Sequence, residues 1–256
     1  MDNRFLRAEA ILGPTSMEKL RRSHVAVLGL GGVGSWCAEA LARAGVGAIT
    51  VMDMDTVSET NVNRQSIALS STLGQPKAEV MARRIRDIAP ECAVTPVVGR
   101  YEAGTREEFF AGNYDFIADA IDLVACKLDL ICEALQRGVP IISALGTGNK
   151  LDPAKLELAD IYDTAVCPLA RVMRKELRRR GVEKLQVVYS REEPITPLFQ
   201  PESEQDASLS PDDPAFYGNK RRSVPGSSPF VPPAAGLLIA SAVVRDILKK
   251  PIDISK

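Results

Sequence analysis

A glycine-rich turn between a buried strand and a helix constrains this chain more than any other feature. The stretch VAVLGLGGVGSW, residues 25–36, starts with apolar residues and continues through Gly29, Gly31 and Gly34 in the spacing G-x-G-x-x-G. Glycines at that spacing let backbone amides approach a phosphate at the N-terminus of the next helix. Gly32 adds a fourth residue without a side chain. The turn predicts a nucleotide site on a strand, turn and helix unit.

An acidic residue at the end of the next predicted strand supports a nucleotide site. The segment ITVMDMD, residues 49–55, is apolar up to Asp53. A carboxylate at the end of the second strand of such a unit accepts hydrogen bonds from ribose hydroxyls. A glycine turn alone also fits tight packing without a ligand, so the interpretation rests on the strand, the spacing and the acid together.

Alternation of short apolar runs with amphipathic segments predicts the fold class. The pattern indicates strands at 25–28, 48–53, 93–98, 115–121 and 140–144, and helices at 16–22, 33–44, 75–89, 105–111 and 124–137. We expect an α/β protein with a Rossmann-like, mixed and mostly parallel sheet flanked by helices.

The second half of the chain has a different pattern. Strands are predicted at 156–161 and 185–189, with helices at 168–180 and 233–249. The polar segment of about 191–232 lacks apolar periodicity and is interpreted as a mobile loop. We expect one domain over residues 1–256, with a nucleotide-binding half at 1–150 and a substrate-facing half at 151–256.

Composition excludes several classes of protein. The formal net charge of -1 gives no global attraction to nucleic acid, so such a partner must meet a local basic patch. The five cysteines form no C-x-x-C pair, which argues against structural zinc and suits a reducing compartment. The start lacks a signal-peptide pattern, and the apolar run PPAAGLLIASAVV is too short to span a bilayer. We expect a cytoplasmic protein that does not bind membranes, with this run in a core helix.

A set of charged and amide side chains follows Asp53. Its members are Asp55, Asn61, Arg64, Gln65, Lys77 and Asp122. A dinucleotide site has little use for two cations here, whereas a triphosphate that loses pyrophosphate needs fixed donors and a metal to neutralise developing charge. Each residue alone also fits an ordinary role: Asp55 as a cap, Lys77 as a solvated residue, and Arg64 in a local ion pair.

The string D-x-D-x-V-x-x-x-N-x-x-R-Q at residues 53–65 resembles the superfamily of ubiquitin-activating enzymes and the bacterial adenylyltransferases of molybdopterin and thiamin biosynthesis. The resemblance covers about residues 4–146 and implies ATP and Mg²⁺ as cofactors. It also implies that Asp53 holds ribose, that Asn61, Arg64 and Lys77 contact phosphates, and that Asp122 binds magnesium.

The opening RFLRAEAILG resembles the superfamily's R-Y-x-R-Q start, in which the second arginine reaches the ATP site of the partner subunit. The resemblance implies a homodimer in which Arg7 is that residue, with Arg4 as the other choice. Ala8 stands where the family commonly has glutamine.

Residues 166–190 and 226–241 resemble one branch of this superfamily, the tRNA threonylcarbamoyladenosine dehydratases. The resemblance implies adenylation of a carboxylate on a modified adenosine, followed by ring closure. Helical spacing independently places Arg171, Arg174, Lys175 and Arg178 on one face as candidate tRNA contacts. A solvated helix face is the alternative.

Cys167 is the candidate reactive thiol. It precedes Pro168 at a predicted helix start, where a thiolate is favoured. A packed, unreactive thiol fits the sequence as well.

Three other functions stay open. An adenylyltransferase for a ubiquitin-like sulfur-carrier protein would need that protein, or another sulfur-transfer protein, as a partner. A dehydrogenase would bind NAD, against which Arg64 and Lys77 argue. A nucleotide-binding module would bind ATP without releasing pyrophosphate.

Overall fold

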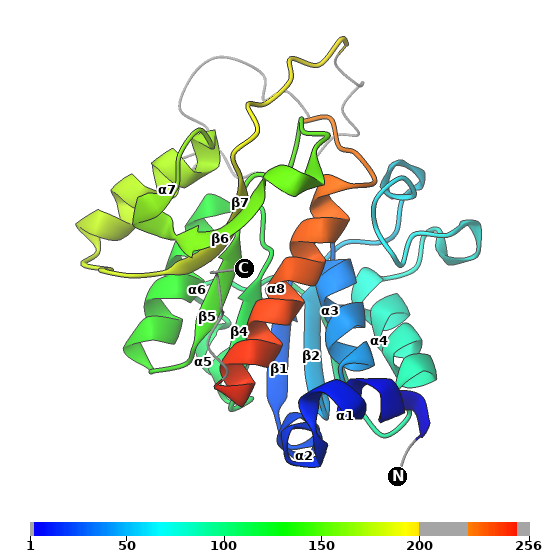
Figure 1. The fold of residues 1–256 in the computed structure, drawn as a ribbon. Helices are drawn as coiled ribbons and strands as arrows, with labels where there is room; N and C mark the ends of the chain where they lie inside the picture. The colour runs from blue at the N-terminus through cyan, green and yellow to red at the C-terminus, as the bar shows by residue number, and fades with distance from the viewer. Residues whose placement is uncertain (1–2, 200–224, 250–256) are drawn as a thin grey trace.

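The computed structural model describes residues 3–199 and 225–249, which form a sheet with helices on both faces (Figure 1). The strands are β1 His24–Leu28, β2 Ala48–Asp53, β3 Ala93–Val98, β4 Phe116–Asp119, β5 Ile141–Ala144, β6 Leu156–Asp160 and β7 Gln186–Ser190. The α-helices are α1 Leu6–Leu12, α2 Pro14–Arg21, α3 Gly34–Arg43, α4 Lys77–Ile88, α5 Arg106–Phe110, α6 Val124–Gln136, α7 Pro168–Arg179 and α8 Val231–Leu248. Short 3₁₀ turns include η2 Glu59–Asn61 and η5 Ile161–Asp163.

The seven strands have the order β3-β2-β1-β4-β5-β7-β6 within the described residues. All neighbouring pairs are parallel except β6 and β7, which are antiparallel. The predicted α/β class with a mixed, mostly parallel sheet is confirmed. The strand order reverses between β1 and β4, and the carboxyl ends of strands at such a switch point form the usual ligand crevice of an open α/β sheet.

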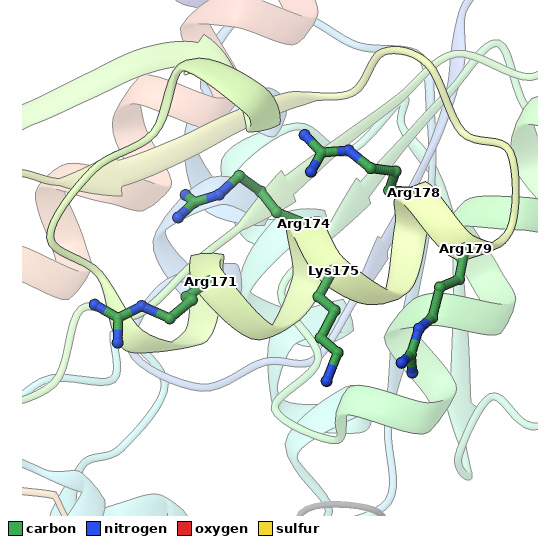
Figure 2. A pocket seen from close by; sticks show the side chains of 5 residues that line it. All are labelled: Arg171, Arg174, Lys175, Arg178 and Arg179. Carbon is green, nitrogen blue, oxygen red and sulfur yellow. The ribbon is translucent and has the colours of Figure 1, made fainter.

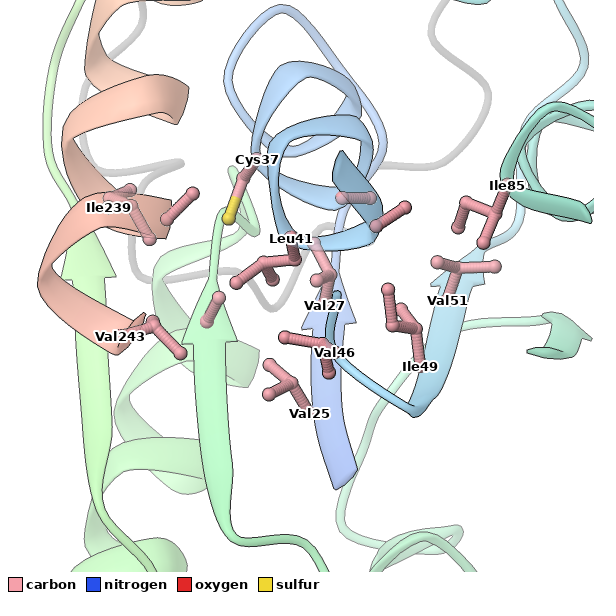
Figure 3. Packing of buried hydrophobic residues seen from close by; sticks show 14 of the residues in the cluster. Val25, Val27, Cys37, Leu41, Val46, Ile49, Val51, Ile85, Ile239 and Val243 are labelled. Atoms are coloured by element: carbon pink, nitrogen blue, oxygen red, sulfur yellow. The ribbon is translucent and has the colours of Figure 1, made fainter. Parts of the chain in front are cut away.

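Two apolar layers cover the sheet because successive side chains of a strand point to opposite faces. Val25 and Val27 of β1 belong to a core layer with α2, α3, α4 and α8, whereas Ala26 and Leu28 belong to the layer with α5, α6 and α7. Figure 3 shows Leu41 of α3 and residues of α8 packed over these strands. Burial of this kind supplies the main driving force for folding.

Helix α8 joins the two halves of the chain. A Cβ built on Gly236 would overlap the carbonyl oxygen of Val33, so only glycine allows α8 to lie this close to α3. By length and apolar composition, the 18 residues of α8 could cross a membrane, but 56% of that window is buried inside the protein. The predicted core helix is therefore present, although it is longer than the apolar run suggested. Its packing against α3 supports the proposal of one domain.

One helix was not predicted, one predicted strand is too long, and most of one predicted loop falls outside the described residues. Helix α1 was not predicted, and the strand predicted at 115–121 ends at Asp119. Most of the loop predicted at about 191–232 lies at 200–224, outside the described residues, and α8 begins at Val231, before the predicted loop end.

Candidate functional site

The glycine turn begins where β1 ends. Gly29 has a φ of 84°, and a Cβ there would lie 2.5 Å from the carbonyl oxygen of Ala120. A Cβ on Gly34 would overlap the carbonyl oxygen of Gly29. By contrast, no atom lies within 4 Å of a Cβ built on Gly31. The glycines at both ends close the turn, and the space at Gly31 leaves room for a ligand against the backbone.

Asp53 holds this turn from the end of β2. Its Oδ2 accepts a hydrogen bond of 2.6 Å from the amide of Leu30, and its Oδ1 accepts one of 2.8 Å from the amide of Asp55. Burial raises the pKa of Asp53, while Lys77 and these two amides act in the opposite direction. The predicted acid therefore lies beside the glycine turn, as a ribose-binding carboxylate requires.

Lys77 is buried at the start of α4 rather than solvated. Its Nζ lies 2.9 Å from Oδ2 of Asp55, and its side chain is 7% exposed against 58% for Asp55. The two simple alternatives, a solvated lysine and an aspartate that only caps a turn, are therefore wrong. The pair places a buried cation beside Asp53, and the charge of Lys77 acts to lower the pKa of that carboxyl.

Arg64 lies against the glycine turn. Its Cγ is 3.2 Å from a Cβ built on Gly32, and its guanidinium donates to the carbonyl oxygen of Thr60 and to Oδ1 of Asn63. Burial lowers the pKa of Arg64, and the charge of Asp122 opposes this shift. Arg64, Asp122 and the turn are thus neighbours, although Arg64 makes no ion pair with a carboxylate in the described part of the chain.

The two amide residues of the motif differ in what they do. Asn61 is buried, and its Oδ1 accepts a hydrogen bond of 3.1 Å from the amide of Ser58, so this oxygen holds the η2 turn. Oε1 of Gln65 is buried and has no hydrogen-bond partner among the described residues. Because a buried unpaired acceptor costs about 1–3 kcal/mol, a ligand donor would stabilise it. Gln65 therefore fits a nucleotide-binding role, and Asn61 retains only its amide nitrogen for one.

Asp122 is exposed in the loop between β4 and α6. No group of three or more histidine, cysteine, aspartate or glutamate residues that could hold a metal occurs among the described residues. Mg²⁺ suits such a site, because it is commonly held by one or two carboxylates together with substrate phosphates and water.

A buried polar cluster next to Asp122 was not predicted. Nζ of Lys127 lies 2.6 Å from Oδ2 of Asp119 and 2.9 Å from Oγ of Ser143. The sequence signal was present, since Lys127 falls at helical spacing on the same face of α6 as Val124 and Ile131. A lone cation on the buried face of a helix needs a buried partner.

Arg7 lies far from the glycine turn of its own chain. It is exposed on α1, and Phe5, two residues before it, is 3.7 Å from a Cβ built on Gly45, just beyond the end of α3. The glycine turn is at the other end of α3, about 15 Å away for a helix of ten residues. Arg7 therefore does not complete its own site, which agrees with a role in a partner subunit.

The predicted basic helix face is present on α7. An open pocket of about 500 Å³ is lined by Arg171, Arg174, Lys175, Arg178 and Arg179 (Figure 2). The four predicted residues lack an ion pair with any described carboxylate, whereas Arg179 pairs with Glu176 at 3.0 Å.

Two of these cations also have structural roles. Arg174 donates to the carbonyl oxygen of Thr164 at 2.8 Å, and Arg178 lies over the ring of Tyr162. Arg171 and Lys175 are exposed and lie one helical turn apart. They are therefore the strongest candidates for contacts with another molecule.

Cys167 is a buried thiol. It is 2% exposed, its Sγ accepts a hydrogen bond of 3.5 Å from the amide of Ala170, and a Cβ on Gly146 would lie 3.2 Å from it. The predicted position at the helix start is found, but this packing favours the unreactive interpretation.

Comparisons with known proteins agree with this geometry. The model of the ThiF family matches residues 3–250. The chain is 44% identical to a tRNA threonylcarbamoyladenosine dehydratase of Bacillus subtilis, covering 97% of this chain and 96% of that protein. It is 36% identical to the molybdopterin-synthase adenylyltransferase of Escherichia coli, over 49% of this chain and 50% of that one.

Solved structures give the same result. The fold matches crystal structures of the E. coli tRNA threonylcarbamoyladenosine dehydratase in complex with AMP and with ATP, each with a TM-score of 0.83 and 33% identity over 96% of this chain and 94% of that chain. With the glycine turn, Asp53, Arg64, Lys77 and Asp122 gathered at one edge of the sheet, the chain belongs to the ThiF family.

Proposed function

We propose that this protein is an ATP-dependent tRNA threonylcarbamoyladenosine dehydratase. The enzyme adenylates the carboxylate of the modified adenosine and closes it into a ring, with release of AMP and pyrophosphate. The observation that carries the proposal is the convergence of the glycine turn, Asp53, Lys77 and Arg64 at the switch point of the sheet. Relatives along the whole chain and the ATP and AMP complexes of the E. coli enzyme support it.

The residues at the sheet edge suit ATP more than NAD. Asp53 would accept hydrogen bonds from the ribose, and the amides of the turn would meet phosphate oxygens. Arg64 and the buried Lys77 would neutralise charge on the phosphates as the bond to pyrophosphate breaks. Gln65 would accept a hydrogen bond from the nucleotide, and Asn61 would contribute through its amide nitrogen.

Asp122 would hold Mg²⁺ together with the phosphates of ATP. The bound ion would supply charge neutralisation for the departing pyrophosphate. Asp122 suits this role because it is exposed, lies near Arg64 and follows the strand next to the glycine turn.

The reaction needs no covalent intermediate with the protein. The substrate carboxylate attacks the α-phosphorus of ATP, which forms an acyl-adenylate and breaks the bond to pyrophosphate. A nucleophile within the same modification then attacks the acyl carbon, closes a five-membered ring and expels AMP. Because this second step is intramolecular, proximity supplies much of its rate. The oxygen lost by the substrate leaves in AMP, so the tRNA loses one water in net terms.

The basic face of α7 is proposed as a tRNA contact. Its four predicted cations, which form no ion pair with a described carboxylate, provide a local patch that the net charge of -1 does not reveal. The second basic cluster noted in the sequence, Lys220 to Arg222, lies outside the described residues. The five free cysteines and a tRNA substrate fit action in the cytosol.

The second candidate is an adenylyltransferase for a sulfur-carrier protein. The match to molybdopterin-synthase adenylyltransferase favours it for the nucleotide half alone. Pyrophosphate release that depends on a small carrier protein and not on tRNA would support it, and ATP binding without pyrophosphate release would support a non-catalytic module. Incubation with ATP and modified tRNA, followed by mass analysis of the nucleosides, tests the main proposal.

A homodimer with shared sites is proposed from the place of Arg7. If Arg7 completes the partner's site, mixing Arg7→Ala and Asp122→Ala protomers should restore activity, because one of the two sites in each mixed dimer has both residues. AMP formation by purified mixed dimers, each inactive as a homodimer, measures this. Absence of rescue in confirmed mixed dimers would contradict action across the interface.

A further inference from the structure

Three polar side chains form a fully buried cluster between β4, β5 and α6. Asp119 and Ser143 are paired positions on the neighbouring parallel strands, and Lys127 projects from α6. Relative exposure of each residue is 0%. The hydroxyl of Ser143 donates to Oδ2 of Asp119 at 2.6 Å, and the ammonium of Lys127 donates to both. Every member of the cluster has a partner.

A buried cluster of this kind contributes little to the net stability of the fold. The desolvation cost of two buried charges can exceed the attraction between them, and apolar residues of similar volume often serve as well. Fully paired polar groups in a low-dielectric core do, however, fix geometry. The position of the cluster shows which segment is fixed.

The cluster holds the short segment that leads to Asp122. Oδ1 of Asp119 accepts a hydrogen bond of 3.0 Å from the amide of Ile121. The other carboxylate oxygen is held by Lys127 of α6, so the carboxylate joins the residue before Asp122 to the helix after it.

The same segment contacts the glycine turn. The amide of Ala120 donates to the carbonyl oxygen of Leu28 at 2.8 Å, and the carbonyl of Ala120 packs against Gly29. A shift of Asp119 would therefore move both the turn and Asp122. The cluster thus links the candidate phosphate site to the candidate metal ligand.

We propose that Asp119, Lys127 and Ser143 are positioning residues that hold Asp122 at the geometry needed for Mg²⁺ and ATP. This proposal rests on the proposed function in one respect, which is the role of Asp122 as the Mg²⁺ ligand. Loss of a partner that orients a metal ligand costs 10–100-fold in metal affinity or activity in general, so the expected effect is of that order.

Two variants test the cluster without leaving an unpaired buried charge. Ser143→Ala removes one hydroxyl, and the double variant Asp119→Asn with Lys127→Met removes both charges. The matched control is Lys150→Met. It removes another buried lysine, whose ammonium donates to the carbonyl oxygen of Ser190. Circular dichroism and melting temperature establish that each variant is folded.

The first readout is binding of a non-hydrolysable ATP analogue by the protein alone, titrated with Mg²⁺. The double variant should need about 10-fold or more Mg²⁺ for half-maximal binding, and Ser143→Ala should shift in the same direction. Lys150→Met should match wild type. A purely structural role for the cluster would lower melting temperature without this shift, which would overturn the proposal.

The second readout is a double-mutant cycle with Asp122→Ala. If the cluster acts through Asp122, its loss should raise the Mg²⁺ concentration needed for half-maximal binding of the analogue in the wild-type background but have no further effect when Asp122 is absent. Additive losses would contradict positioning. If wild type forms no AMP with modified tRNA, the proposed function fails, while the Mg²⁺ titration still decides the role of the cluster.

Discussion

Replacing Lys77 by methionine is expected to lower AMP formation by at least about 10²-fold, because a fixed cation at a developing phosphate charge is worth that much. Methionine keeps the apolar volume in the buried space beside Asp53, and Asp55 loses its partner in a mostly exposed position. Arg64→Ala should have a loss of similar size. AMP and pyrophosphate release under saturating ATP and modified tRNA measures both.

The matched control is Lys19→Met. Lys19 is exposed on α2, which precedes β1 and so lies at the opposite end of that strand from the glycine turn. It should retain wild-type turnover, and all three variants should show the same circular dichroism spectrum. Normal turnover in folded Lys77→Met protein would remove this lysine from the adenylation step.

Reversing Arg171 and Lys175 to glutamate is expected to weaken tRNA binding strongly and to flatten its dependence on salt. Each lost phosphate contact lowers the slope of log affinity against log salt by about one. These two residues are chosen because Arg174 and Arg178 also hold Thr164 and Tyr162, so their loss would disturb the protein itself. Binding at several salt concentrations gives the slope, and affinity for ATP should be unchanged.

The control for charge is the reversal of Arg83 and Arg86, two exposed residues on α4. Figure 1 shows α4 and α7 on opposite sides of the molecule. This variant has the same net charge as the α7 variant but should bind tRNA as wild type does. An equal loss of tRNA binding in both variants would show that binding depends on the total charge of the protein. Wild-type binding by both variants would show that the α7 face is only a solvated surface.

Local patterns predicted most of the fold. Strand β2 has the bounds expected from its apolar run, and α7 begins at Pro168 as expected because proline is favoured in the first turn of a helix. Helix α1 was missed because it is short and leaves Leu6 and Ile11 exposed, so it lacks the apolar stripe of a packed helix. The strand predicted at 115–121 ends early because the carboxylate of Asp119 turns the chain at Ile121.

The sequence predicted which residues make up the candidate site, but it did not predict their burial or their contacts. The motif placed Asp53, Arg64 and Lys77 at one sheet edge because strand ends meet there. Burial of Lys77 depends on how α4 docks beside Asp55, and the pairing of Lys127 with Asp119 joins residues of different elements. Such contacts arise from tertiary packing, which local sequence patterns do not encode.

The central claim is tested most directly by one incubation of the wild-type protein with ATP, Mg²⁺ and tRNA that carries threonylcarbamoyladenosine. The account predicts that the modified nucleoside becomes lighter by one water while AMP and pyrophosphate form in equal amounts. Unchanged nucleoside mass, together with pyrophosphate release that requires a small carrier protein instead of tRNA, would contradict it.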